Sequence, residues 1–313
     1  MLAYIQRRLL MLIPVLLGIS VVVFLVMHIA PGDPAEILAG PMASASDIAA
    51  LRAKLGLDDP VWVQYWRFMK GILKGDLGTS IQSGEPVREM LATRFPNTLA
   101  LAVASMIVAT VLGLTAGIIS AVNKGSMFDS LSMIVALLGI SLPSFWIGLM
   151  LMLVFAVRLR WLPVAGYSGQ WWTVEGIRQL ILPAVTLGIG TSALIARITR
   201  SSMLEIMKED YVRTARAKGL GQFVTIGKHV LRNAFIPVST VMGLNFGGLL
   251  GGTVITESVF AINGVGRLMV RAITSRDFPV VQGAVFLVAT TFVFVNLLVD
   301  IAYALLDPRI RYY

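Results

Sequence analysis

The sequence of 313 residues contains no cysteine and only two histidines, His28 and His229. The absence of cysteine excludes disulfide bonds, thiol nucleophiles and thiolate metal sites. The two histidines lie far apart in the sequence, so neither a histidine-based metal site nor a catalytic triad is expected. We therefore predict no catalytic centre, no bound metal and no other cofactor.

The motifs of nucleotide and hydrolase chemistry are also missing. No G-x-x-x-x-G-K-[ST] phosphate loop is present, because Gly227 and Lys228 are followed by His229 and lack the earlier glycine. Neither H-E-x-x-H nor G-x-S-x-G occurs. The G-x-G at 264–266 stands alone, outside a strand–helix context. The chain is therefore expected not to be an enzyme and not to hydrolyse ATP itself.

Charge is scarce and apolar residues are abundant. Charged residues make up 14% of the chain and hydrophobic residues 57%, with a mean hydropathy of +0.81, whereas a soluble domain has about a quarter charged residues. Six apolar runs reach or approach the ~20 residues that cross a bilayer. They are residues 9–30, 99–122, 131–157, 182–198, 234–259 and 285–306. We predict an all-α, polytopic membrane protein with six transmembrane helices.

The first run, which follows Arg7 and Arg8, differs from a signal peptide. Its apolar part is too long, and no small-x-small cleavage site follows it. We expect it to remain as a membrane helix.

An even number of spans places both termini on one side of the membrane. That side holds 13 basic and 5 acidic residues, and the other side 13 basic and 11 acidic. The basic counts are equal, but most outer basic residues lie in the long segment 31–97, and long segments follow the positive-inside rule poorly. We expect both termini in the cytoplasm. The excess positive charge then faces lipid headgroups of the bilayer or a cytoplasmic partner, and nothing indicates nucleic acid.

Three regions follow from this pattern: an N-terminal segment with the first span (1–30), an extracytoplasmic helical segment (31–97), and a core with five spans (98–313) that contains a cytoplasmic loop at 201–233. In the extracytoplasmic segment we expect a helix capped by Ser46 that ends at Gly56 and a second helix from Pro60. The second helix has one apolar face, formed by Trp62, Trp66, Met69 and Leu73. We expect this segment to pack on the outer ends of the spans.

Helix-breaking and polar residues at membrane depth mark candidate pathway or gate positions. Pro143 follows Ser141, so the third run should kink there and free backbone carbonyls. Glycines spaced by four surround Asn245 in the fifth run, a pattern that suits close helix packing, a gate or a subunit interface. Glu257 is a carboxylate near the outer end of that run. The candidate pathway or gate residues are Ser141, Pro143, Asn245, Gly247 and Glu257.

The most informative stretch is the polar, basic island at 209–237, between the fourth and fifth runs. Good helix formers at 211–218 precede Gly219, which stands where a left-handed C-cap would end a helix. Beyond it, Phe223, Ile226 and Val230 recur at helical spacing. A charge run is more often a solvated loop, but two amphipathic turns about a glycine favour a docking element.

This island resembles the EAA loop of permeases in bacterial ABC importers, in which E-A-A is followed by a spaced glycine and then by I-x-L-P. Ala215, Gly219 and Leu231 fit that general pattern. The variant TARAKG followed by LRNAFIPV is similar to the branch of dipeptide, oligopeptide, glutathione and nickel importers.

Other segments along nearly the whole chain resemble the same branch. They are residues 28–34, 75–80, 86–87, 94–99, 257–267 and 307–311. At Asn263 the chain departs from the proline that more often precedes the glycine. The overall length and the long first outer segment resemble the first of the branch's two permease subunits.

The resemblance implies a type I importer permease of the bacterial inner membrane that carries short peptides. It also implies the partners: a second homologous permease, two cytoplasmic ABC ATPases that hydrolyse ATP, and an extracytoplasmic substrate-binding protein. The residues expected to contact the ATPase are Tyr211, Arg213, Ala215, Arg216, Lys218 and Gly219. Gly219 would provide the turn, and the small Ala215 would permit close approach.

Two alternatives remain open at this point. The nearest is a permease for nickel or another small solute, although the lack of a histidine or cysteine cluster opposes metal ligation by this chain. The second, from a different class, is a membrane scaffold or an intramembrane enzyme that works without an ATPase. Co-purification with an ATPase separates these classes.

Overall fold

The computed structural model of the chain describes residues 2–29, 33–40 and 42–306, and its regular structure is helical. A single β-bridge between Thr79 and Pro86 is the one strand-like pairing in these ranges. The sequence segments at 30–32 and 307–311, which carry part of the resemblance, lie outside the described residues.

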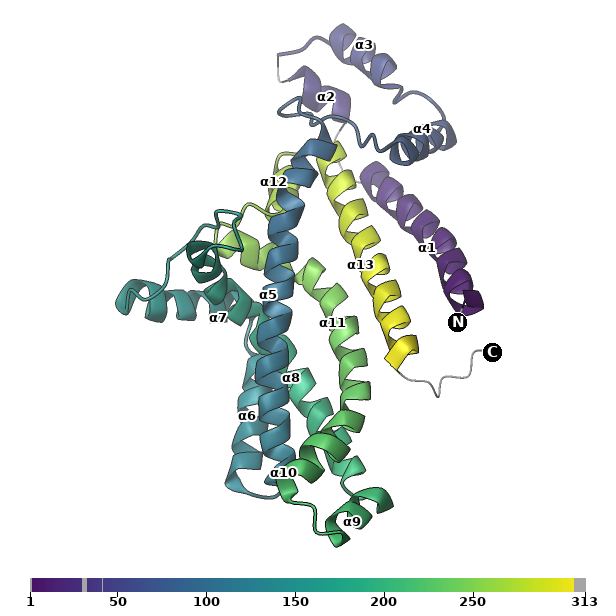
Figure 1. Cartoon of the computed structure of the whole chain (residues 1–313). Coiled ribbons are helices and arrows are strands. Elements are labelled where there is room, and N and C mark those ends of the chain that lie inside the picture. The colour runs from purple at the N-terminus through teal and green to yellow at the C-terminus, as the bar shows by residue number, and fades with distance from the viewer. Residues whose placement is uncertain (1, 30–32, 41, 307–313) are drawn as a thin grey trace.

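The elements, labelled in Figure 1, are α1 (Leu2–Ile29), α2 (Pro34–Ala39), α3 (Ala45–Leu55), α4 (Val61–Lys74), α5 (Val87–Val122), α6 (Met127–Ser141), α7 (Ser144–Leu151), the π-helical η1 (Met152–Arg158), α8 (Val174–Ile206), α9 (Asp210–Ala217), α10 (Gln222–Val224), the π-helical η2 (Thr225–Leu231), α11 (Arg232–Val259), α12 (Val265–Thr274) and α13 (Phe278–Leu306).

Two long helices, α5 and α8, form the centre of the bundle and pack against each other more extensively than any other pair in the described ranges. Glycine allows their close approach. A Cβ added at Gly113 would lie 2.8 Å from the carbonyl oxygen of Ser192, and one added at Gly117 would lie 2.7 Å from that of Ala196. Small residues serve this purpose in membrane helix pairs generally. Beside this pair stand α11 and α13, and α1 packs on α13 at the edge (Figure 1).

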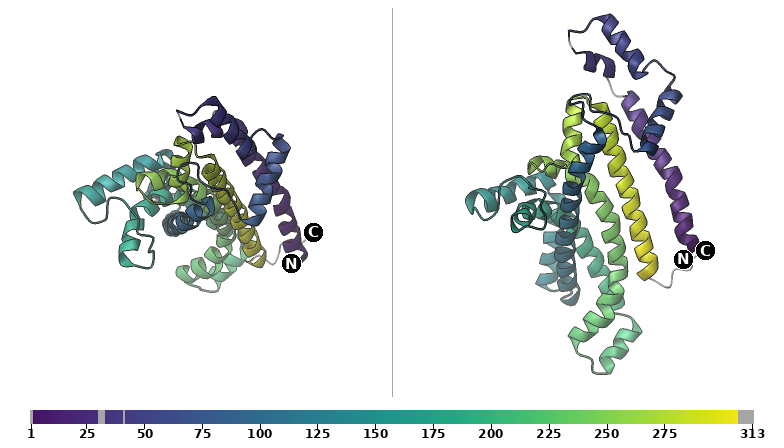
Figure 2. Two further views of the ribbon diagram at one scale, coloured as in Figure 1. Left: turned by 90° about the horizontal axis from the view of Figure 1, so that it is seen from above. Right: turned by 45° about the horizontal axis from the view of Figure 1, so that its top comes forward.

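The third apolar run is broken rather than straight. α6 ends at Ser141, α7 begins at Ser144, and the segments on either side of the break are bent by 106°. Leu142 at the break is extended, with φ −87° and ψ 136°, because Pro143 disfavours a helical conformation in the residue before it. The predicted kink is confirmed. α6 continues beside α8, whereas α7 and η1 project sideways from the bundle (Figure 2).

The predicted number of membrane helices is reproduced only in part. Within the described ranges, α5, α8, the continuous helix Gln222–Val259 and α13 are each long and apolar enough to cross a bilayer. The bent pair Met127–Ser141 and Ser144–Arg158 gives a fifth if the two parts count as one span. In α1 the side chains are described over Leu9–Leu25, and this apolar stretch is shorter than the spans above. Each of the six predicted runs nonetheless corresponds to helical structure, so the all-α assignment is confirmed.

One ion pair ties three helices together near the end of the bundle that carries α9. Arg200 in α8 donates from Nε and Nη2 to the two carboxylate oxygens of Asp129 in α6, each at 2.8 Å. Ser120 in α5 also donates to Asp129, and the Gly125 N–H donates at 3.0 Å. Asp129 is buried, and a bidentate partner with two further donors offsets the cost of removing its charge from water.

Residues 33–40 and 42–86 form a small helical layer at the opposite end of the bundle (Figure 1). Ser44 caps α3 through the Asp47 N–H, so the predicted cap at Ser46 is wrong by two positions. Gly56 ends α3, as predicted, and Gly75 ends α4, both in the left-handed region. α5 begins at Val87 and continues through Pro96 into the second span.

Candidate functional site

The predicted docking element forms a short helix and a glycine turn at one end of the molecule (Figure 1). α9 ends at Ala217, and Gly219 has a φ of +81°, in the region that favours glycine. The Gly219 N–H donates to the carbonyl of Arg216 at 2.9 Å, and the Leu220 N–H donates to that of Ala215 at 3.3 Å. These bonds satisfy carbonyls at the helix end. The predicted left-handed turn is confirmed.

The second part of the element is not a separate helix. From Gln222 to Val259 the chain is one continuous helix that passes through α10, η2 and α11. The amphipathic turn after the glycine is therefore the first turn of the helix that becomes the fifth span. The docking element and this span are joined without a loop.

The apolar face of α9 packs on the bundle. Val212 is fully buried, in a cluster with Met203 of α8, and Ala215 is only 6% exposed. The Tyr211 hydroxyl accepts a hydrogen bond from Asn233 Nδ2 at 2.8 Å, which ties α9 to α11. Ala215, predicted to allow close approach of a partner, thus faces the bundle itself in this structure.

The opposite face of α9 is positively charged and exposed. Arg213, Arg216 and Lys218 all lie on the surface, together with Gly219. The nearest carboxylate to Arg213 is that of Asp210 on the same helix, at 3.9 Å. A pair this exposed and this long contributes little to stability, so these side chains are available to another protein.

Phe223 stands out next to this charged face. It is 91% exposed, which is unusual for phenylalanine. Its spacing with Ile226 and Val230 predicted a common docking face, but the structure separates the three side chains. Val230 is fully buried and Ile226 packs against the same internal cluster as Val212, whereas Phe223 points outward at the end of the element.

Two of the predicted pathway residues meet at the break in the third span. Pro143 and Asn245 line a cavity of about 510 Å³ between the α6–α7 break, α8 and α11. Backbone groups at such a break lack their usual helical hydrogen-bond partners. Non-helical backbone at membrane depth is found where it lines a cavity or is covered by protein. Ser141 is exposed beside the break, and its hydroxyl donates to the carbonyl of Leu137 at 2.9 Å.

The other two predicted pathway residues face the protein interior. A Cβ added at Gly247 would lie 2.8 Å from the ring of Phe292 in α13. Glu257 is fully buried. Thr98 Oγ1 donates to its Oε1 at 2.7 Å, and the Arg267 N–H donates to its Oε2 at 2.9 Å. The carboxylate therefore joins α5, α11 and α12, and both of its oxygens are engaged.

The glycines of α11 lie on two different faces of the helix. Gly243 and Gly247 pack against α13, where an added Cβ would meet side chains. Gly248, Gly251 and Gly252 are exposed, and no atom lies within 4 Å of a Cβ added there. Only this second group offers a close approach to a helix of another chain.

Replacing Glu257 with leucine is expected to lower the stability of the chain and to release α12. The buried Arg267 N–H and Thr98 hydroxyl would lose their acceptor, at about 1–3 kcal/mol for each unsatisfied group. Glu257→Gln keeps one acceptor oxygen and should retain most of the stability. Thermal unfolding in a mild detergent measures the difference. Equal melting temperatures for Glu257→Leu and the unmodified chain would contradict this role.

A second buried carboxylate, Asp277, holds the outer segment and was not predicted. Asp277 is 4% exposed and lies just before α13. Its Oδ1 accepts from the Ile81 N–H at 3.1 Å, and its Oδ2 accepts from the Ser80 hydroxyl. The sequence signal was present as a single aspartate just before the apolar α13, but its partners lie almost 200 positions earlier in the chain.

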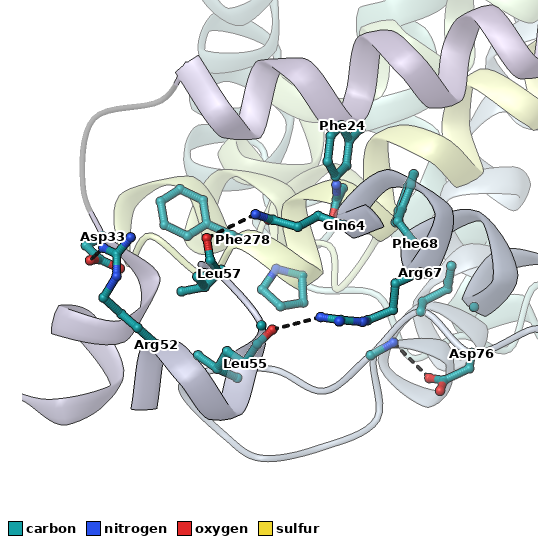
Figure 3. Close-up of a pocket in the computed structure, with 16 residues that line it drawn as sticks. Phe24, Asp33, Arg52, Leu55, Leu57, Gln64, Arg67, Phe68, Asp76 and Phe278 are labelled. Atoms are coloured by element: carbon teal, nitrogen blue, oxygen red, sulfur yellow. Dashed lines mark hydrogen bonds and ion pairs between the residues drawn. The ribbon is translucent and has the colours of Figure 1, made fainter. Parts of the chain in front are cut away.

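A cavity of about 720 Å³ lies between the outer segment and the adjoining ends of α1 and α13 (Figure 3). Three phenylalanines and two arginines are among its lining residues. Arg52 pairs with Asp33 and Asp58, and Arg67 pairs with Asp59 at 2.5 Å. The pKa of Arg52 is raised, most by its hydrogen bond to Asp58 and next by its hydrogen bond to Asp33. The arginine charges of this cavity are thus matched by carboxylates of the same chain.

The chain matches a known family and known proteins along its length. Residues 113–312 match the family described as binding-protein-dependent transport system inner membrane component, and residues 1–102 match its N-terminal component. The chain is 47% identical to the dipeptide transport system permease protein DppB of Alkalihalophilus pseudofirmus over 333 aligned positions, which cover 100% of both chains. It is 48% identical to the glutathione transport system permease protein GsiC of Salmonella paratyphi A over 312 positions, again covering 100% of both.

The fold is also similar to that of solved transporters. A structure of inward-facing conformations of the MetNI methionine ABC transporter contains a chain with a TM-score of 0.57 and 19% identity. The alignment covers 70% of the present chain and 96% of that one. A second crystal form of the same transporter gives a TM-score of 0.55 at 17% identity, with the same coverage.

Proposed function

Because the chain belongs to the family of binding-protein-dependent transport system inner membrane components, and is thus a multi-pass membrane permease, we propose that it forms part of the pathway by which short peptides enter a bacterial cell. The full-length similarity to a dipeptide permease and to a glutathione permease supports peptide cargo. Such a permease is a transport subunit and has no catalytic centre of its own.

The observation that carries the mechanism is the way α9 is attached. Its inner face is packed on α8 and η2, and its outer face carries Arg213, Arg216 and Lys218. A partner that binds the outer face and moves would therefore move the bundle with it. Rigid-body motion of this kind is the usual way in which transporters change access to a central site.

We place the α9 end in the cytoplasm, which puts both termini there and the α3 end outside. ATP hydrolysis then belongs to two cytoplasmic ATPases, one of which binds α9 and the turn that follows it. A second homologous permease completes the pathway, and an extracytoplasmic binding protein delivers the peptide. The family description, which names binding-protein-dependent transport, supports this set of partners.

The contact surface for the ATPase differs from the residues chosen from sequence alone. We propose that it consists of Arg213, Arg216, Lys218 and Gly219, with Leu220 and Phe223 as its apolar part. Leu220 is 40% and Phe223 is 91% exposed. An exposed aromatic side chain next to arginines is the composition that dominates binding energy at protein interfaces.

A single exposed side chain tests the ATPase contact. Phe223→Asp should release the ATPase when the transporter is purified from membranes in a mild detergent, because a charge replaces the apolar anchor. Gln222→Asp is the matched control, since it adds the same charge to the neighbouring exposed position, and it should retain the ATPase. Recovery of the ATPase with Phe223→Asp would contradict the proposed contact. Recovery of no ATPase with the unmodified chain would argue for a scaffold that works without one.

The proposed pathway includes the break in the third span. Pro143 and Asn245 line its cavity, and Ser141 lies beside it. Gly247 and Glu257 enter the proposal as packing residues that hold α11 in place. Uptake of a labelled dipeptide, glutathione and nickel by the complete transporter in proteoliposomes decides the cargo. Nickel uptake without peptide uptake would favour the small-solute alternative.

A further inference from the structure

α4 lies across the end of α1 that leads into the outer segment, and one of its faces packs on that helix (Figures 1 and 3). The ring centroids of Tyr65 and Phe68 lie 5.4 and 6.0 Å from that of Phe24 in α1. The hydroxyls of Tyr65 and Ser20 are 2.8 Å apart, so they share a hydrogen bond. The contact is specific and ties α4 to two successive turns of α1.

The neighbouring face of α4 is apolar and exposed. Trp62, Trp66 and Leu73 are 73%, 67% and 78% exposed. Residues four and eleven positions apart lie on one face of a helix, so these three side chains form a single stripe. The sequence predicted this stripe and predicted that the outer segment packs on the spans. In the structure, Tyr65 and Phe68 pack on α1, and the stripe faces outward.

The contact with α1 sets the depth of α4 relative to the bilayer. Ser20 and Phe24 both lie inside the apolar run 9–30. At a rise of 1.5 Å per residue, Phe24 is about 8 Å from the end of α1 at Ile29. Helices that lie in the plane of a membrane surface bury their apolar face about 5–10 Å into the boundary between headgroups and acyl chains. α4 is held within that range.

We propose that α4 is an interfacial helix that inserts Trp62, Trp66 and Leu73 into the outer leaflet of the bilayer. Tryptophan is enriched at membrane–water interfaces, where its ring is buried and its N–H stays hydrated. Lys70 and Lys74, both exposed, follow the stripe on its margin and have stems long enough to reach the headgroups. An apolar stripe of this size is otherwise rare on a surface that faces water. Because α4 also lines the 720 Å³ cavity, the membrane would fix the height of that cavity.

Site-directed spin labelling of the complete transporter in lipid nanodiscs tests this proposal. The chain has no cysteine, so a nitroxide can be placed singly at positions 62, 66 and 73 without removing native thiols. At each position, the ratio of collisions with oxygen to collisions with a water-soluble nickel chelate should be several-fold higher than at Lys54. Lys54 is the control because it is exposed on α3, away from the proposed membrane contact.

Position 70, on the margin of the stripe, provides a further site should a tryptophan substitution prevent folding, and it should report a shallower but still lipid-like ratio. Ratios at 62, 66 and 73 equal to that at Lys54 would overturn the proposal, because the stripe would then face water. Low accessibility to both reagents would overturn it too. In that case a protein covers the stripe, and repeating the measurement without the binding protein or without the second permease would identify which one.

Discussion

Replacing Gly219 with proline is expected to abolish ATP-driven uptake by the assembled transporter while membrane insertion of the chain stays intact. Gly219 has a φ of +81°, whereas the proline ring holds φ near −65°. The substitution also removes the N–H that donates to the Arg216 carbonyl. The turn must therefore change its path, and α9 loses its position relative to α10. Motion of a bound ATPase would then no longer reach the fifth span.

Two alanine variants separate backbone conformation from crowding at this turn. No atom lies within 4 Å of a Cβ added at Gly219 or at Gly221, but Gly221 has a φ of −57°. Gly219→Ala should cost about 1–2 kcal/mol from the left-handed conformation alone and reduce uptake, whereas Gly221→Ala should behave like the unmodified chain. Uptake in proteoliposomes measures the coupling, and flotation of membranes measures the insertion of each variant. Normal uptake by Gly219→Pro would remove the coupling role.

Substituting valine for both Gly113 and Gly117 is expected to disrupt the centre of the bundle and to prevent accumulation of folded protein. Cβ atoms at these positions would lie 2.8 and 2.7 Å from backbone carbonyl oxygens of α8. The backbone of α8 cannot change its rotamer as a flexible side chain can, so α5 and α8 must move apart. Overpacking costs about 1–3 kcal/mol per site and sometimes more, a large part of the stability of most folded proteins.

Gly18→Val is the matched control for this variant. Gly18 also lies within an apolar helix, but no atom lies within 4 Å of a Cβ added there. Size-exclusion chromatography of a fluorescent fusion in mild detergent should show a monodisperse peak for the control and an aggregated one for the double variant. A monodisperse peak for both would mean that α5 and α8 can pack at a greater separation than in this structure.

Features set by local backbone chemistry could be predicted from the sequence. The turn at Gly219 and the break before Pro143 both follow from the conformations that glycine and proline favour. The size of the bend at Pro143 could not be predicted, because it depends on how α6 packs on α8. Gly139, for example, lies so close to Ile189 that an added Cβ would be 2.9 Å from its side chain. A contact between segments far apart in the chain cannot be recognised from the spacing of residues in the sequence.

The direction of side chains in the docking element was harder to predict. α9 has eight residues, with alanine on both of its faces. Ala215 is buried and Ala217 is exposed, and nothing in their chemistry distinguishes them. The same limit applies to Glu257, whose partner Thr98 lies 159 positions earlier in the chain. A carboxylate at membrane depth predicts an important contact, but only the folded chain shows that the contact is internal.

The unbroken helix from Gln222 to Val259 has a mechanical consequence. It is on the order of 55 Å long at the usual helical rise, so under the proposed coupling it would act as a lever between the two surfaces of the membrane. A displacement of a few ångströms applied beside Phe223 would then reach the Glu257–Thr98 contact without passing through a chain of side-chain rearrangements. The wider π-helical turn of η2 lies near the end where the ATPase would bind, and its stiffness would set how much of the displacement is transmitted.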